Sequence, residues 1–218
     1  MQKSNSHWQW PFKIFGIISL YLSLIAGAIK LTIMNRPLYI WVLKTMDIPK
    51  QVGMSLGNIL KNYDILLDYL RDSSVAKLQM PDFPSSESGA FHFWEVRNLF
   101  ILNDRALIVF GIMTVMFLYW VYKNQCWTWL AQVSRKLLFL PIVVVGLLAL
   151  FFDQLFVLFH EIAFDNDAWI FSPATDPIIQ VLPQEYFMAC FISVFVLVEI
   201  GTAMIYWLSR RRASGKNE

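Results

Sequence analysis

Residues 14–34 read IFGIISLYLSLIAGAIKLTIM and carry a single charge, that of Lys30. A helix needs about 20 predominantly apolar residues to cross the hydrocarbon core of a bilayer. Three further runs fit this requirement: residues 106–122 carry no charge, residues 137–159 carry only Asp153, and residues 186–209 carry only Glu199. The sequence therefore predicts an all-α membrane protein with four transmembrane helices.

The composition of the 218-residue chain agrees with a location in lipid. Hydrophobic residues make up 57% of the chain and charged residues 16%, against about 25% charged residues in an ordinary soluble domain. These values exclude a disordered chain and a disulfide scaffold, and they argue against a soluble globule. The net charge of +2 gives no sign of the basic surface that a nucleic-acid partner requires.

The distribution of Lys and Arg predicts the orientation in the membrane. Basic residues gather before the first apolar run, between the second and third runs, and after the fourth, whereas residues 160–185 contain no Lys or Arg. By the positive-inside rule both termini of this multi-pass protein are cytoplasmic. The predicted segments are a cytoplasmic N-terminus with the first span (1–34), an extracellular helical segment (35–105), the second span (106–122), a cytoplasmic loop (123–136), the third span (137–159), an acidic extracellular loop (160–185), and the fourth span with a basic cytoplasmic tail (186–218).

The long segment between the first two spans is predicted to be helical. Apolar residues from Val52 to Leu70 recur at helical spacing between charged residues, which is typical of an amphipathic helix that begins after Pro49 and ends at Arg71. A second amphipathic helix, residues 91–103, is expected to lead into the second span. These helices either pack on the transmembrane core or cover a lipid site at the interface.

Two of the three histidines, His92 and His160, fall on the outer side close to predicted membrane boundaries. Glu95 follows His92 by three residues, so on a helix it shares one face with the imidazole and can orient it. Asp153 precedes His160 by seven residues, a spacing that also returns to one helix face. A histidine pair with carboxylate neighbours predicts general acid–base catalysis.

The segment after His160 supplies further polar and aromatic candidates. We expect the polar side chains to support the histidines by hydrogen bonding and the aromatic side chains to line the substrate site. The predicted supporting residues are Glu95, Asp153, Glu161, Asn166, Asp167 and Asp176, and the predicted lining residues are Trp169 and Phe171.

Motifs for other chemistries are missing from the sequence. It has no G-x-S-x-G, P-loop, H-E-x-x-H or C-x-x-C motif. Ser172 and Cys190 are candidate nucleophiles on the outer side, and neither lies in a motif that would activate it. Cys126 falls on the opposite side of the predicted membrane, so the two cysteines cannot pair. Two histidines with one acidic ligand would suffice for a metal ion, but the spacing does not support such a site, and no metal or cofactor is predicted.

Two stretches resemble the signature of a family of bacterial membrane proteins. Residues 159–177 read FHEIAFDNDAWIFSPATDP, and residues 92–96 read HFWEV, with Glu95 where the family usually has Asp. With these stretches the chain resembles the lipoprotein intramolecular transacylases, Lit, of Gram-positive bacteria. The resemblance extends from the first apolar run through the fourth, and its specific part lies between Asn166 and Pro177.

The resemblance implies an acyltransferase of the bacterial cell membrane with its active site at the outer leaflet. Its substrate would be a diacylated lipoprotein, whose sn-2 acyl chain moves from the diacylglyceryl group to the amine of the N-terminal cysteine and leaves the lyso form. The family's two essential histidines map onto His92 and His160. Membrane lipid is the other expected partner, and the protein is expected to act as a monomer without a cofactor.

Two other interpretations stay open. The first is a metal-dependent membrane hydrolase that uses His92, His160 and an acidic ligand, and metal in the purified protein would favour it. The second is a non-catalytic membrane sensor or scaffold, which would tolerate substitution of both histidines.

Overall fold

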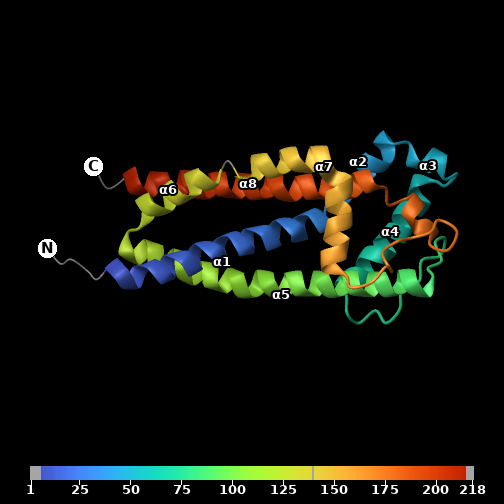
Figure 1. Cartoon of the computed structure of the whole chain (residues 1–218), viewed down its shortest axis with the longest axis horizontal. Coiled ribbons are helices and arrows are strands. Elements are labelled where there is room, and N and C mark those ends of the chain that lie inside the picture. Colours follow the sequence, from blue (N-terminus) through green and yellow to red (C-terminus); the bar gives the residue numbers. More distant parts are fainter. Residues whose placement is uncertain (1–5, 139, 215–218) are drawn as a thin grey trace. The chain divides into compact units, whose positions relative to one another are not determined.

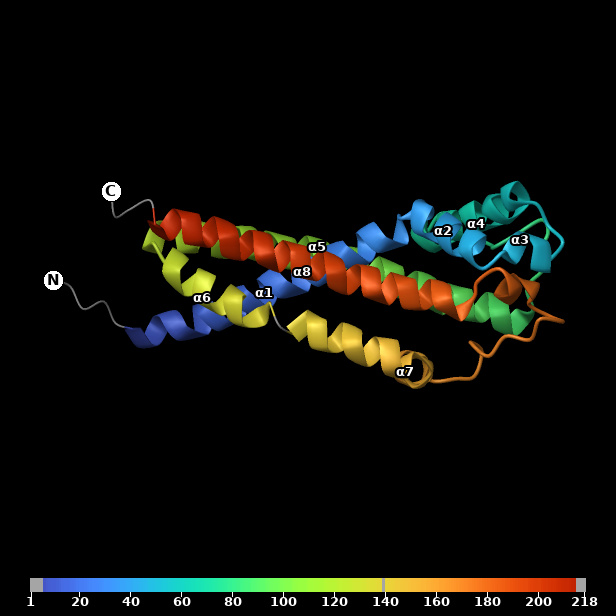
Figure 2. The same cartoon turned by 90° about the horizontal axis from the view of Figure 1, so that it is seen from above.

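The computed structural model describes residues 6–138 and 140–214, and every regular element in these ranges is a helix (Figure 1 and Figure 2). The predicted all-α class is therefore confirmed. In chain order the elements are α1 (Ser6–Ile33), α2 (Arg36–Thr45), α3 (Ile48–Gln51), α4 (Leu56–Arg71), α5 (Glu87–Asn124), α6 (Trp127–Leu137), α7 (Leu140–Ala163), the 3₁₀ helix η1 (Pro177–Gln180) and α8 (Gln184–Ser214).

Within the described residues, three helices are long and apolar enough to cross a membrane: α1 from Gln9 to Ile33, α5 and α8. They correspond to the first, second and fourth predicted spans. The third, residues 137–159, corresponds to α7 and stays a prediction, with residue 139 outside the described residues. The backbone of α7 leaves the helical conformation at Phe151 (φ −131°, ψ 27°). The helical part that follows Phe151 carries Asp153 and His160.

The chain divides into two compact units, each with its own hydrophobic core. The first unit comprises Met1–Thr32, Asn103–Leu147 and Ile192–Glu218. The second comprises Ile33–Leu102 and Leu148–Phe191. The first unit contains α6, most of α1 and α8, and the later part of α5. The second unit contains α2, α3 and α4, together with the start of α5 and the end of α7.

The helices of the first unit are joined by a close approach and by polar contacts. The Phe117 ring lies so near Gly16 that a Cβ at this position would overlap it. Ser23 Oγ lies 3.0 Å from Thr114 Oγ1, so α1 and α5 run side by side here, as Figure 1 shows. Small residues and side-chain hydrogen bonds are the usual means by which helices associate in lipid.

Large apolar side chains cover much of the outer surface of these helices. The most exposed on α5 and α8 include Val115 at 68%, Ile108 at 63% and Met204 at 58%. A contiguous exposed apolar surface marks a site of contact with membrane or protein. This surface fits contact with lipid along the long helices.

Helix α4 confirms the predicted amphipathic helix of the second unit, although it begins at Leu56 rather than directly after Pro49. Ser55 Oγ accepts a hydrogen bond from the Asn58 amide at 3.2 Å and so caps the helix. The turn before it passes through Gly53 (φ 67°), a conformation that glycine adopts without strain. Helix α5 also begins earlier than predicted, at Glu87, and leads without a break into the second span.

Three tyrosines from α2, α4 and α8 form the centre of the second core. The Tyr39 and Tyr63 rings stack with centroids 3.9 Å apart, and the Tyr63 and Tyr186 hydroxyls lie 2.6 Å apart. The Tyr39 hydroxyl donates to the Val181 carbonyl at 2.7 Å. Burial raises the pKa of Tyr63 to about 12, so the hydroxyl stays protonated at neutral pH. These contacts tie the elements of the second unit into the scaffold that carries the histidines.

Candidate active site

The two outer histidines lie side by side within the second unit. His92 on α5 and His160 on the last turns of α7 have ring centroids 5.9 Å apart. The Phe164 ring contacts both, with centroids 4.7 Å from His92 and 5.6 Å from His160. The end of α7 reaches α5 here (Figure 1). The preceding turns of α7 contact the start of α8, because the Phe156 and Phe187 ring centroids lie 5.6 Å apart. Two imidazoles at this separation can act on one bound substrate.

The tautomer of His160 follows from its hydrogen bond. Nδ1 lies 2.7 Å from the backbone oxygen of Phe156. A carbonyl oxygen only accepts, so Nδ1 carries the ring proton and Nε2 keeps its lone pair. Burial lowers the pKa of His160, and the bond to Phe156 offsets this in part. At neutral pH the ring is therefore uncharged with a free acceptor nitrogen, which is the form that a general base needs.

Aromatic rings surround His160 on several sides. Trp169 lies 4.8 Å from it and Phe156 4.2 Å, measured between ring centroids. Sequence reasoning included Trp169 but missed Phe156 and Phe164. Both lie four residues from His160, the spacing of one helix face. That spacing is the signal that could have found them.

His92 is almost fully buried, with 7% of its surface exposed, and its Nδ1 has no hydrogen-bond partner among the described residues. Glu95 Oε2 lies 3.9 Å from this nitrogen, which is beyond hydrogen-bond distance. This oxygen is also buried without a partner. The other oxygen of Glu95, Oε1, accepts from Asn166 Nδ2 at 2.8 Å. Buried polar atoms without partners are rare in folded proteins, and each calls for an explanation.

The remaining predicted site residues have varied surroundings. Phe171 lies against His92 with centroids 5.5 Å apart. Asp153 accepts a hydrogen bond from Gln184 Nε2 at 2.7 Å, on α8. Glu161 and Asp167 are exposed. The predicted residues that the structure brings together are His92, His160, Glu95, Asn166, Trp169 and Phe171.

Asp176 anchors the loop after α7 to the start of α5. It is 3% exposed, and its Oδ1 accepts from the Ser86 amide at 2.8 Å. Its Oδ2 accepts from Ser86 Oγ, also at 2.8 Å. Ser86 directly precedes α5, the helix that carries His92. Asp176 therefore supports the site by holding one end of this helix.

Gly89→Ala is expected to disrupt this anchor and lower the melting temperature of the purified protein. A Cβ on Gly89 would overlap the Asp176 carboxylate, and overpacking of a buried site costs about 1–3 kcal/mol. Gly57→Ala on α4 is the matched control, because the nearest atom to its added Cβ is Ser55 Oγ at 3.9 Å. The control should melt at or above the wild-type temperature, since alanine favours a helix. Equal melting temperatures for wild type and Gly89→Ala would contradict the anchoring role.

Comparison with known proteins identifies the family. The model of the lipoprotein intramolecular transacylase Lit matches residues 14–187, a range that includes both histidines and the whole of residues 159–177. The chain belongs to the Lit family. It is therefore an acyltransferase, and the resemblance found in the sequence is confirmed.

Solved Lit structures share the fold of this family member. The in meso structure of the membrane-integral Lit from Bacillus cereus superposes with a TM-score of 0.91 at 27% identity and covers 98% of this chain and 99% of that one. Two structures of the Bacillus cereus protein with one histidine replaced, by arginine or by alanine, superpose with TM-scores of 0.85 at 27% identity. They cover 97% of this chain and 94% and 96% of their own. No curated protein sequence matches the chain.

Within the described residues, no three His, Cys, Asp or Glu side chains are placed to hold one metal ion. Cys126 and Cys190 are both free, as the sequence predicts.

Proposed function

We propose that this Lit-family chain catalyses intramolecular O-to-N acyl transfer in a diacylated lipoprotein, with His160 as the general base. The sn-2 acyl chain of the diacylglyceryl group moves to the α-amine of the same N-terminal cysteine, and the product is the N-acylated lyso form. The observation that carries the proposal is the free Nε2 of an uncharged His160 beside the buried His92.

The reaction needs a single group that acts first as a base and then as an acid. At pH 7 roughly a tenth of an α-amine is unprotonated. As the amine nitrogen attacks the ester carbonyl carbon, His160 Nε2 takes the N–H proton. As the bond between that carbon and the glycerol oxygen breaks, the same nitrogen returns the proton to the oxygen. One amide and one hydroxyl replace one amine and one ester, so no cofactor or co-reactant is required.

The residues around His160 orient the substrate. In the proposal, His92 donates a hydrogen bond to the ester oxygen on which negative charge develops. The rings of Phe164, Phe171 and Trp169 give the acyl chains an apolar surface and exclude water. Amine and ester are already linked in one molecule, so holding them in the reactive geometry supplies much of the rate.

Glu95 is the group that we assign to the substrate amine. Its Oε2 and His92 Nδ1 are buried, lack partners and lie 3.9 Å apart. A substrate ammonium or amine can donate hydrogen bonds to both atoms, and charge-assisted bonds of this kind are strong. Asn166 holds the other carboxylate oxygen and so fixes its direction. Glu95 thereby does more than orient His92.

Glu95→Gln should weaken binding of a diacyl lipopeptide with a free amine by about 10- to 100-fold, since a hydrogen bond to a charged group contributes about 1.5–3 kcal/mol. Binding of the N-acetylated lipopeptide, which has no ammonium group, should stay at the wild-type level. Glu161→Gln is the control, because Glu161 is exposed. Equal losses for the two ligands would show that Glu95 acts only through the structure of the site.

The proposed placement in the membrane has four spans, cytoplasmic termini and an active site at the outer leaflet. The distribution of Lys and Arg supports it, and so does the presence of both histidines within the unit that contains most of residues 35–105 and 160–185. In a background with Cys126 and Cys190 replaced by serine, a membrane-impermeant maleimide should label Ser172→Cys in intact cells and leave Ser214→Cys unlabelled. Labelling of both positions to the same extent would contradict this orientation.

Mass spectrometry of a lipoprotein N-terminal peptide, from cells with and without this protein, tests the function. The diacyl and lyso forms are isomers of equal mass, so fragment ions must locate the second acyl chain. With the protein present, we expect that chain on the amine, and without it on the glycerol. Release of free fatty acid in place of the isomer would instead identify a hydrolase.

A further inference from the structure

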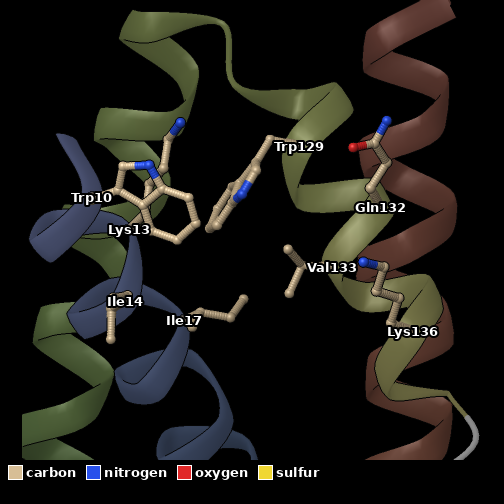
Figure 3. A pocket seen from close by; sticks show the side chains of 8 residues that line it. All are labelled: Trp10, Lys13, Ile14, Ile17, Trp129, Gln132, Val133 and Lys136. Carbon is tan, nitrogen blue, oxygen red and sulfur yellow. The ribbon is translucent and has the colours of Figure 1, made fainter. Parts of the chain in front are cut away.

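A cavity of about 330 Å³ lies within the first unit, between the first turns of α1 and helix α6 (Figure 3). It is separate from the histidine site, which belongs to the second unit. Figure 3 shows Trp10 and Ile17 of α1 facing Trp129 and Val133 of α6 across the cavity. The lining residues are Trp10, Lys13, Ile14, Ile17, Trp129, Gln132, Val133 and Lys136.

Two ammonium groups and no carboxylate line this cavity. The Lys13 Nζ lies over the Trp129 ring, 5.3 Å from its centroid. Neither Lys13 nor Lys136 takes part in the ion pairs that the described residues form. The cavity therefore carries two positive charges for which the described part of the chain supplies no anion.

Apart from Gln132, the rest of the lining is apolar or aromatic. The lining residues lie close to the ends of apolar runs in the sequence, where a membrane interface is expected. Lys13 directly precedes the apolar run 14–34, and Lys136 directly precedes the apolar run 137–159. Trp and Lys at the ends of apolar runs are typical of the level of lipid headgroups. Ile14, Ile17 and Val133 add an apolar surface to the lining beside the two lysines. A molecule that pairs with the lysines and also covers the apolar lining has an anionic headgroup and a hydrocarbon chain.

We propose that this cavity binds one anionic phospholipid. The positive charges of Lys13 and Lys136 attract the anionic headgroup, and the apolar side chains of α1 and α6 contact the first part of an acyl chain. Basic pockets between membrane helices bind lipid headgroups in this way, and the volume lies within the range of ordinary ligand sites. Free phosphate could pair with the lysines but would leave the apolar lining unused.

Native mass spectrometry of the full chain in detergent, with added phosphatidylglycerol or phosphatidylcholine, tests the proposal. Wild type should retain phosphatidylglycerol in preference to phosphatidylcholine. Each basic residue near a membrane surface contributes about 1 kcal/mol, which corresponds to about a fivefold change in affinity. Lys13→Gln with Lys136→Gln should therefore weaken phosphatidylglycerol binding by about 25-fold and leave phosphatidylcholine binding unchanged.

Two further variants and one competitor make the outcome specific. Lys13→Arg with Lys136→Arg keeps both charges and should restore binding. Lys123→Gln removes an exposed charge from α5 that lies over Tyr119 and does not line the cavity, so it should bind as wild type does. An excess of inorganic phosphate should not displace the lipid. Wild-type affinity in the double glutamine variant, an equal loss in Lys123→Gln, or displacement by phosphate would each overturn the proposal.

Discussion

His160→Ala should lower the rate of lyso-form production by about 10²- to 10⁴-fold, the usual contribution of a general acid–base group. The variant loses Nε2 of His160, whose lone pair is available because the Phe156 carbonyl holds the ring proton on Nδ1. The measurement is the conversion of a synthetic diacyl lipopeptide by purified variant and wild type at equal concentration.

This prediction has two controls: all variants are compared at equal protein abundance, and the histidine outside the pair is also replaced. His7→Ala removes the histidine outside the pair and should convert substrate at the wild-type rate. His160→Gln keeps a polar side chain at the position but supplies no base, and it should be as inactive as His160→Ala. Near-normal conversion by either variant of His160 would remove this residue from the catalytic assignment.

The lowered pKa of His160 predicts the shape of the pH profile. The base is active when uncharged, and burial extends this form to pH values below the ordinary histidine pKa of about 6.5. Of the reacting groups, only the substrate amine titrates between about pH 6.5 and pH 8, so the slope of log(kcat/KM) against pH should be about 1 near pH 6.5 and fall to about one half near pH 8. The slope should reach 2 only below the pKa of His160. A slope of about 1.5 at pH 6.5, which a histidine of ordinary pKa would give, would contradict an uncharged, buried base.

His92→Ala should cause a loss of similar size, about 10²- to 10³-fold, if it stabilises the developing negative charge as an oxyanion donor does. Its ring is 7% exposed, so the alanine variant also leaves a cavity. His92→Gln keeps a hydrogen-bond donor of similar size and should recover part of the activity. The rates of both variants are to be compared at equal amounts of folded protein.

The double variant decides whether the two histidines act in one step. Groups that act as a unit are strongly non-additive, so His92→Ala with His160→Ala should be little slower than the slower single variant. Losses that multiply would indicate that the two rings, 5.9 Å apart, act in separate steps.

Much of the second unit could be predicted from local patterns. The amphipathic helix up to Arg71 follows from apolar spacing, but its start at Leu56 depends on the Ser55 cap and the turn at Gly53. The break of α7 at Phe151 has no glycine or proline at that residue to announce it. Asp153 shares a helix period with His160, yet it bonds Gln184, 31 residues further along the chain. A helix period shows which side chains share a face but not which neighbour meets that face.

By itself the sequence determined the all-α class, three of the helices that can cross a membrane, and the histidine pair as the candidate site. These features follow from local rules, because a span needs only enough apolar residues and a helix satisfies its own backbone. The tertiary structure alone decided that Asn166 holds Glu95, 71 residues away, and that Asp176 holds Ser86, 90 residues away. It also decided which nitrogen of His160 is free. Such contacts depend on how distant segments pack and on where each buried polar atom finds a partner, and neither is encoded in the spacing of residues along one helix.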